Sequence, residues 1–235
     1  MRFLGDTALL TGRSLRHITR SPDTIITTTI MPIAFMLLFV YVLGGAINSG
    51  TDSYVTYLLP GILLITIASG IAYTAYRPFL DLQSGIFERF QSMPIARSSV
   101  LWAHVLTSLV ASTISVVVVV LVALLMGFRS SAGVLAWLAV AGILVLFTLA
   151  LTWLAVIAGL SAKTVDGASA FSYPLIFLPF VSSAFVLTAT MPGPVRAFAE
   201  NQPVTTGIWV ALAWCLGILV VAYAIAMAIY RRKAV

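Results

Sequence analysis

Charge is scarce in this sequence, and its scarcity decides the class of protein. Only 9% of the 235 residues are Asp, Glu, Lys or Arg, while 61% are hydrophobic. Soluble globular chains carry about 25% charged residues, so this composition excludes an ordinary water-soluble domain. The apolar residues form unbroken runs of about 18 residues or more, which are typical of transmembrane α-helices and unlike the short alternating strands of a membrane β-barrel.

Six such runs are present, and we expect each of them to cross the membrane. They extend over residues 23–43, 57–76, 100–126, 134–160, 169–189 and 207–230. The expected fold is an all-α membrane protein in which residues 23–230 form one domain of six transmembrane helices. An amphipathic segment (1–22) precedes this domain, and a short tail (231–235) follows it.

Asp, Glu, Lys and Arg are missing from the interiors of the six runs, and Arg77, Lys163 and Asp166 lie at their edges. A carrier driven by protons or sodium normally needs a carboxylate or an unwound helix inside the membrane. The chain also lacks a GxxxxGK[ST] phosphate-binding loop and an HExxH metal motif, and no motif pairs His104 with a nucleophile. These absences argue against a membrane enzyme and a carrier acting alone, so energy for transport would come from a partner.

Cysteine is nearly absent as well. The one cysteine, Cys215, lies in the sixth run, which excludes a disulfide within the chain and favours a small packing residue. Other small residues in the runs, such as Ser112 and Ser115, are expected to allow neighbouring helices to approach closely.

The net charge of +6 could indicate a nucleic-acid partner, but the positions of the charges indicate membrane topology instead. If the runs alternate across the membrane, eleven of the 13 basic residues fall on one side. These are Arg2, Arg13, Arg16, Arg20, Arg77, Arg89, Arg97, Lys163, Arg231, Arg232 and Lys233. The other side has only Arg129 and Arg196. Because basic residues stay in the cytoplasm, we expect both termini there and no nucleic-acid partner.

The first 20 residues combine an apolar and a basic helical face, placed at about 100° per residue. The apolar face consists of Leu4, Ala8, Thr11, Leu15 and Ile18. The opposite face carries Arg2, Asp6, Arg13, Arg16, His17 and Arg20. A helix of this kind lies in the membrane interface, where Arg13, Arg16 and Arg20 would face headgroups and water; an ordinary packing helix is the alternative.

The connection between the second and third runs, RPFLDLQSGIFERFQSMPIARSS (77–99), is also amphipathic and is bounded by prolines. Its apolar helical face consists of Leu82, Ile86, Phe90 and Met93. Its polar face carries Asp81, Ser84, Glu88 and Gln91. Such a helix either rests on lipid headgroups or inserts into a groove of a soluble partner, where Glu88 and Arg89 would fix its orientation.

This connection resembles the cytoplasmic loop of type-2 ABC exporter permeases, particularly the daunorubicin-resistance type of drug-efflux permease. The resemblance rests on Gly85, Glu88, Arg89, Met93, Pro94, Ile95 and Arg97. The leading amphipathic helix, the six runs and ENQPVT (200–205) before the last run agree with it. That family usually has a longer stretch after the ENQPVT-like motif, whereas here the last run follows at once. Either the chain is shortened at this point or a loop has been omitted, and we favour omission.

The resemblance implies a permease that pairs with a second copy of itself and with two separate ATP-binding subunits, in a bacterial inner membrane. ATP and magnesium would be held by those subunits, and this chain would need no cofactor. Residues 84–97 would be a coupling helix seated on the ATP-binding subunit, and the leading helix would add a second contact. The coupling residues would be Gly85, Phe87, Glu88, Arg89, Phe90, Met93, Pro94 and Arg97.

The resemblance also implies a transport pathway at the dimer interface, lined by the first, second and fifth runs. Its aromatic candidates are Phe35, Phe39, Tyr73, Tyr76, Phe171, Tyr173, Phe177 and Phe180. Aromatic rings suit large amphipathic or cationic molecules, although packing or an interfacial belt explains such residues equally well. The uncharged runs favour a hydrophobic or amphipathic cargo such as a drug, an antibiotic or a lipid-like molecule. Export of a polysaccharide or glycolipid, a stand-alone secondary carrier and a passive scaffold stay open.

Overall fold

The computed structural model describes residues 5, 7, 9–12, 14, 26–43, 54–85, 97–129, 133–181 and 204–233. All regular elements in these residues are helical. The N-terminal positions 5, 7, 9–12 and 14 are helical, and the further elements are η1 (Ile26–Ile30), α3 (Met31–Leu37), η2 (Leu38–Leu43), α4 (Tyr54–Gln83), α6 (Arg97–Leu125), α7 (Val134–Ser161), α8 (Val165–Ala170), α9 (Ser172–Val181) and α11 (Val204–Lys233). The all-α class expected from the composition is confirmed for this part of the chain.

Four of these helices are long and apolar enough to cross a membrane. They are α4, residues Ser99–Leu125 of α6, α7, and residues Trp209–Tyr230 of α11. Helices satisfy every backbone hydrogen bond internally, which is why long apolar runs of this kind fold as helices in lipid. The first expected run contains a shorter apolar helix, Thr28–Val42, and the described part of the fifth consists of the end of α8 and the whole of α9.

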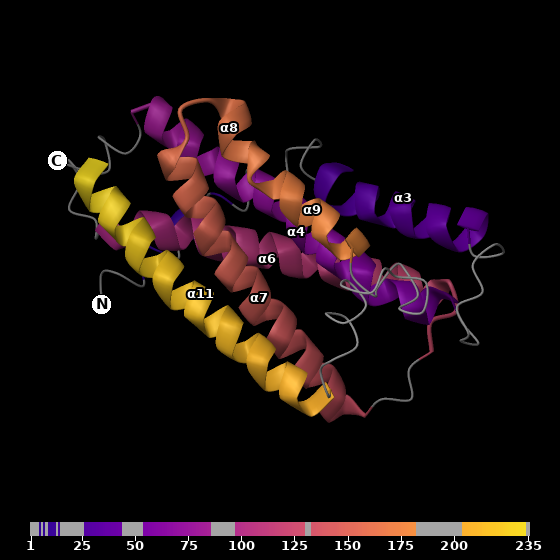
Figure 1. The fold of residues 1–235 in the computed structure, drawn as a ribbon. Coiled ribbons are helices and arrows are strands. Elements are labelled where there is room, and N and C mark those ends of the chain that lie inside the picture. The colour runs from indigo at the N-terminus through magenta and orange to yellow at the C-terminus, as the bar shows by residue number, and fades with distance from the viewer. Residues whose placement is uncertain are drawn as a thin grey trace.

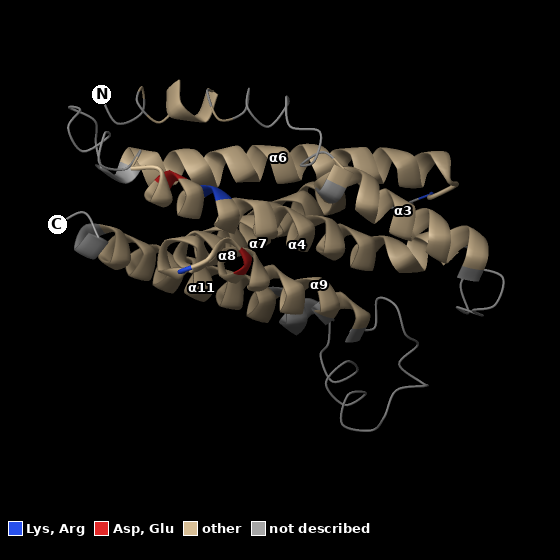
Figure 2. Cartoon of the chain, turned by 90° about the horizontal axis from the view of Figure 1, so that it is seen from above, with Lys and Arg blue, Asp and Glu red and all other residues tan. Residues whose placement is uncertain are grey.

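Helix α4 is the centre of the bundle. It contacts α3, α6, α7, α8 and α9, whereas α11 packs along α7 on the outside (Figure 1). Two-thirds (67%) of the apolar window of α4 is buried, against 17% for α7 and α11, so α4 is the most enclosed of the four long helices. The described N-terminal helical positions and the C-terminal end of α11 lie at the same end of the bundle (Figure 2).

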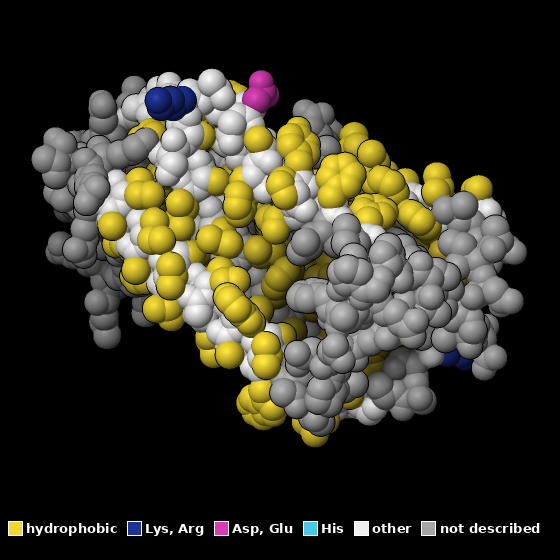
Figure 3. Space-filling view, in the orientation of Figure 1, with side chains coloured by type: hydrophobic (Ala, Val, Ile, Leu, Met, Phe, Trp, Pro, Cys, Tyr) yellow, Lys and Arg dark blue, Asp and Glu magenta, His cyan; other side chains and the backbone are white. Residues whose placement is uncertain are grey.

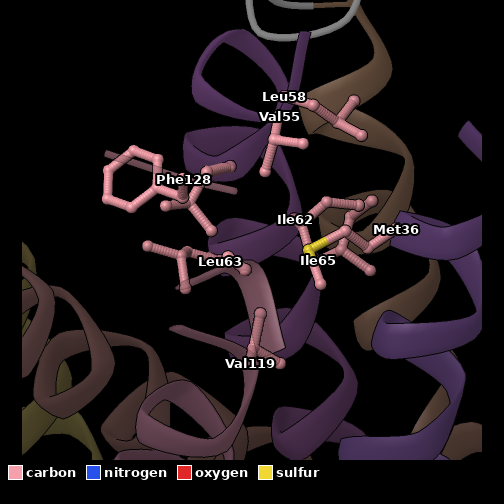
Figure 4. Close-up of a cluster of buried hydrophobic side chains, with 10 residues drawn as sticks. Met36, Val55, Leu58, Ile62, Leu63, Ile65, Val119 and Phe128 are labelled. Carbon is pink, nitrogen blue, oxygen red and sulfur yellow. The ribbon is translucent and has the colours of Figure 1, made fainter. Parts of the chain in front are cut away.

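Three clusters of buried side chains hold the helices together. In the first, Met36 of α3 lies against Ile62 and Ile65 of α4, with Val119 of α6 beside them (Figure 4). The second joins α6, α7 and α11 around Trp153, whose ring centre lies 5.3 Å from that of Trp102 and 4.9 Å from that of Tyr223. The third joins α4 and α7 through Ile67, Ile71, Ala75, Leu151 and Ala155.

The outer surface of the bundle is as apolar as its interior. Large hydrophobic side chains on α6, α7 and α11 are exposed, and hydrophobic side chains cover much of the face in Figure 3. An apolar surface of this extent is suited to lipid, not water. Charged residues of the described part lie mainly in the half of the bundle nearest the termini, with one basic position beyond the far end of α6 (Figure 2).

The connection between α4 and α6, the second and third predicted runs, is shorter than the sequence predicted. Helix α4 continues past Tyr76 to Gln83, and α6 already begins at Arg97, so the expected connection 77–99 shrinks to 84–96. Pro78 lies inside α4 and is buried. Proline removes one helix hydrogen bond and its ring crowds the carbonyl four residues earlier, but contacts with neighbouring helices let a membrane helix tolerate it.

Gly85 has a specific reason to be glycine. It follows the end of α4 with a φ of 68°, a left-handed conformation that side chains with a Cβ disfavour. The backbone N–H of Ser84 donates to the carbonyl oxygen of Leu80 at 2.9 Å, which closes the last turn. Gly85 therefore ends the helix at the start of the connection.

Helix α11 begins at Val204 and passes through Thr205, Thr206 and Gly207 without a break. This continuity does not test whether a loop has been omitted after the ENQPVT segment, and that expectation stays a prediction. Thr, Gly, Ile and Trp follow one another with no proline after Pro203, so the helix can start directly behind it.

Candidate functional site

The two ends of the connection 84–96 are tied together by a polar contact. Asp81 lies in the last turn of α4 and His104 in the second turn of α6, and His104 Nε2 is 3.1 Å from Asp81 Oδ2. The side chains are 8% and 27% exposed, respectively. A neutral or a protonated imidazole can donate this hydrogen bond through Nε2–H, and the protonated form makes it an ion pair.

This pair is a structural contact and not a metal centre in the part of the chain that the structure describes. No group of three or more His, Cys, Asp or Glu side chains comes together in those residues. Two ligands alone do not make the four-ligand sites typical of bound zinc. The chemistry available at this point is thus a directional hydrogen bond between two helices.

The N-terminal helical segment packs against the same end of the bundle. Thr7 is buried, Leu10 packs against the Trp153 cluster, and the Arg77 guanidinium lies 3.5 Å from the Ser14 carbonyl oxygen, a long hydrogen bond. The central carbon (Cζ) of the Arg77 guanidinium lies 5.7 Å from the centre of the Tyr73 ring, within the range of a cation–π contact.

These contacts use a third face of the N-terminal segment. Measured from Leu4 at about 100° per residue, Thr7, Leu10 and Ser14 point to roughly 240–300°, between the apolar face near 0° and the basic face near 180°. The segment can therefore contact the bundle through its flank. The sequence analysis missed this flank because its members, two hydroxyl residues and one leucine, form no hydrophobic pattern.

The predicted coupling residues are only partly described. Gly85 ends α4, and Arg97 is the first residue of α6. The other coupling residues, Phe87, Glu88, Arg89, Phe90, Met93 and Pro94, lie outside the described residues, as do Arg13, Arg16 and Arg20 of the leading helix.

Four of the eight predicted pathway aromatics converge on one ring. The centre of the Phe180 ring lies 6.4 Å from Phe35, 6.3 Å from Phe39 and 6.4 Å from Phe177. These residues come from α3, η2 and α9, so the first and fifth predicted runs meet here. Phe177 is 65% exposed, which leaves one edge of this aromatic cluster open to a ligand or lipid.

The other four predicted aromatics lie elsewhere. Phe171 packs on the third core cluster between α4 and α7, and Tyr73 lies beside Arg77. Tyr76 is half-buried and Tyr173 is exposed. The eight predicted aromatics therefore divide into four that form an aromatic cluster around Phe180 and four at other positions.

A crevice lined by hydroxyl groups separates η1, α4 and α6. Its lining includes Thr28, Thr66, Tyr73, Thr74, Ser108, Ser112 and Ser115. Its cavity of about 10 Å³ holds at most one water molecule, so it is a contact between helices and not a cargo site.

Two observations show how closely the helices approach at this crevice. Thr29 Oγ1 lies 2.9 Å from Ser115 Oγ, which joins η1 to α6, and a Cβ on Gly70 would lie 3.0 Å from Ser112 Oγ. The prediction that Ser112 and Ser115 serve close helix approach is confirmed. Thr29 belongs to a π-helical turn, as does Phe39 of the aromatic cluster, and such turns are frequent at functional sites.

A second cavity, an apolar groove of about 260 Å³, lies between α4, α6 and α7. Val116 and Val120 of α6 and Trp137 and Leu144 of α7 line it. Its threonines present little polarity, because Thr113 and Thr148 donate their hydroxyls to carbonyl oxygens of their own helices at 2.7 Å. The groove suits hydrocarbon, as expected for a surface in contact with lipid.

Comparisons with known proteins agree with this architecture. The family described as "ABC-2 type transporter" matches residues 6–216. The daunorubicin resistance ABC transporter permease protein DrrB1 of Streptomyces coeruleorubidus is 28% identical over 241 residues, covering 94% of this chain and 84% of the relative. The probable doxorubicin resistance ABC transporter permease protein DrrC of Mycobacterium tuberculosis is 26% identical over 219 residues, covering 92% and 78%.

Proposed function

This chain belongs to the ABC-2 type transporter family, and from that premise we propose that it is the membrane permease of an ATP-driven exporter of hydrophobic or amphipathic compounds. It is a multi-pass membrane protein by its family and its long apolar helices. The relatives named for resistance to daunorubicin and doxorubicin support a drug-like cargo. The open aromatic cluster around Phe180 supports the same cargo class, since aromatic rings favour flat amphipathic molecules.

The proposed topology has six spans with both termini in the cytoplasm of a bacterial cell. The end of α4 with Arg77 and the end of α7 before Lys163 lie at the end of the bundle nearest the termini, whereas Arg129 follows the far end of α6. An excess of basic residues on one side supports placing that side in the cytoplasm.

In this proposal, ATP hydrolysis takes place on two separate subunits that contact the connection 84–96 and the leading helix. Phe87, Glu88, Arg89, Phe90, Met93 and Pro94 would seat the connection in a cleft of the ATP-binding subunit. A second copy of this chain would complete the pathway, with α3 and α9 facing it. The chain itself would bind no nucleotide.

The observation that carries the proposal is the position of α4. It leads directly into the connection 84–96, and it contacts the helices that carry the aromatic cluster. At 30 residues it is about 45 Å long, enough to reach across the bilayer as one continuous helix. A displacement at its cytoplasmic end would therefore shift α3 and α9 and change access to the aromatic cluster.

The need for a partner gives the first prediction. Purified and reconstituted alone in liposomes, the chain should not accumulate a hydrophobic cationic dye under a proton or sodium gradient. In the described spans, the Asp, Glu, Lys and Arg residues are confined to the last turns of α4, and none lies in the membrane interior where it could couple to such a gradient. Adding the ATP-binding subunit and ATP should produce transport, measured by dye fluorescence. A partner subunit without its Walker A lysine is the control, and gradient-driven accumulation by the chain alone would disprove the proposal.

The aromatic cluster gives the second prediction. Phe180→Ala removes the ring that the other three share, so the KM for a flat aromatic cargo should rise about tenfold, since each aromatic contact is worth up to about 1.5 kcal/mol. The measurement is ATP-dependent uptake into inverted vesicles. Trp214→Ala, an equal loss of an aromatic ring on the exposed face of α11, should leave the KM unchanged. Equal KM values for both variants and the wild type would remove the cluster from the pathway.

A further inference from the structure

We propose that the Asp81–His104 pair is the latch that makes α4 and α6 move as one unit when the connection 84–96 is pushed. This inference rests on the proposed function and adds to it a pair of positioning residues outside the predicted coupling motif. The pair transmits movement and does not contact nucleotide or cargo.

The position of the pair is the first argument. Residues 82–103 separate Asp81 from His104 in sequence, and the whole connection lies between them. The 3.1 Å contact therefore joins the two helices directly where the connection leaves one and enters the other, so that the chain between them forms a closed loop. A force applied anywhere on this loop reaches both helices at the same point.

The surroundings of the pair are the second argument. Next to it, Leu82 packs against the cluster containing Val100, Leu101 and Val105, which are apolar contacts. Apolar contacts are non-directional, so they hold two helices together without preventing one from sliding or rotating against the other. The hydrogen bond between Nε2 and Oδ2 has a required distance and angle, and it fixes the register of the two helices.

The burial of the pair is the third argument. Fully exposed ion pairs contribute little because water competes with them, but His104 is only 8% exposed. Removing one partner leaves the other poorly solvated beside apolar side chains, so the contact is retained through movement. If the Asp81–His104 hydrogen bond is kept during movement, a displacement of the connection 84–96 moves α4 and α6 together.

The experiment uses the full chain together with its ATP-binding subunit. Asp81→Ala and His104→Phe each remove the latch, whereas His104→Arg keeps an N–H donor at this position. The double variant Asp81→Ala/His104→Phe tests whether the two residues act through each other. Asp166→Ala, which removes an exposed carboxylate at α8, is the matched control. The measurements are co-purification of the ATP-binding subunit, ATP hydrolysis, and cargo transported per ATP hydrolysed.

Each latch variant should lower the transport per ATP about tenfold, within the range of known coupling free energies, while co-purification and basal hydrolysis stay at wild-type levels. The double variant should be no worse than either single variant, because residues that act through one contact are non-additive. His104→Arg should recover most of the lost coupling. Losses that multiply in the double variant, or an His104→Arg protein as impaired as His104→Phe, would overturn the latch.

A second measurement separates this inference from the proposed function. Spin labels on cysteines introduced at Leu80 and Leu106, in a Cys215→Ala background, report the spacing of α4 and α6 by electron paramagnetic resonance. The distance distribution should be narrow with the latch intact and broad in Asp81→Ala. An unchanged distribution would overturn the latch, whereas a broadened distribution in a protein that shows no ATP-dependent transport would count against the proposed function alone.

Discussion

Gly159→Ala is expected to prevent the membrane domain from folding stably, because α7 lies against α4 without room for a side chain at this position. A Cβ on Gly159 would overlap the carbonyl oxygen of Ala75 and lie 3.1 Å from its carbonyl carbon. Backbone atoms of a buried helix cannot move aside as a flexible side chain can, so the destabilisation should exceed about 3 kcal/mol, the upper part of the usual range for overpacking. Yield of monodisperse protein and the melting temperature in detergent measure the effect.

Gly142→Ala is the matched control for this prediction. Gly142 belongs to the same helix, α7, and a Cβ there would meet nothing within 4 Å. Because alanine has the higher helix propensity in water, this variant should be neutral or slightly stabilising. Comparable melting temperatures for Gly159→Ala and Gly142→Ala would show that α4 and α7 are not in contact at Ala75.

The long helices could be predicted from the sequence because hydrocarbon leaves the backbone no alternative. Four of the six expected runs coincide with helices long enough to span a membrane, and in α7 the predicted and observed ends differ by one residue. The end of α4 could not be predicted in this way. Pro78 reads as a helix boundary in the sequence, but burial against neighbouring helices overrides that local preference.

Because the predicted end of α4 was wrong, the contact between Asp81 and His104 could not be predicted either. With α4 expected to stop at Tyr76, Asp81 belonged to the polar face of a loop helix and His104 had no partner in sequence. The extra turns of α4 bring the two side chains within 3.1 Å of each other. Contacts between residues this far apart depend on how two helices are rotated and aligned, which hydrophobic periodicity does not encode.

The sequence predicted four of the eight aromatic candidates that meet in one cluster, but not the positions of the others. The sequence identified aromatic residues in the first and fifth runs, and Phe35, Phe39, Phe177 and Phe180 do meet. It could not show that Phe171 is turned into the core between α4 and α7. The orientation of Phe171 follows from packing, because a run that is apolar on all sides gives no preferred face.

The second large effect is expected in the connection itself. Glu88→Ala and Phe90→Ala should each weaken assembly with the ATP-binding subunit or separate hydrolysis from transport. Phe90 lies on the apolar face predicted for this segment and would fill a pocket on the partner, while Glu88 would accept a charged hydrogen bond. Truncating one partner of a buried, charged hydrogen bond at an interface costs about 2–5 kcal/mol. Retention of the tagged ATP-binding subunit on the permease, followed by ATPase activity with and without cargo, measures the loss.

Two matched variants on the opposite side of the membrane serve as controls for this test. Glu200→Ala and Phe198→Ala repeat the same two substitutions near Arg196, on the face that the proposed topology places outside the cell, where an ATP-binding subunit cannot reach. Both should retain the subunit as the wild type does. If Glu88→Ala and Phe90→Ala also retain it with unchanged hydrolysis and transport, the connection is not the coupling element. If instead Glu200→Ala and Phe198→Ala release the subunit, the topology is inverted, because the partner then reaches the opposite end of the bundle.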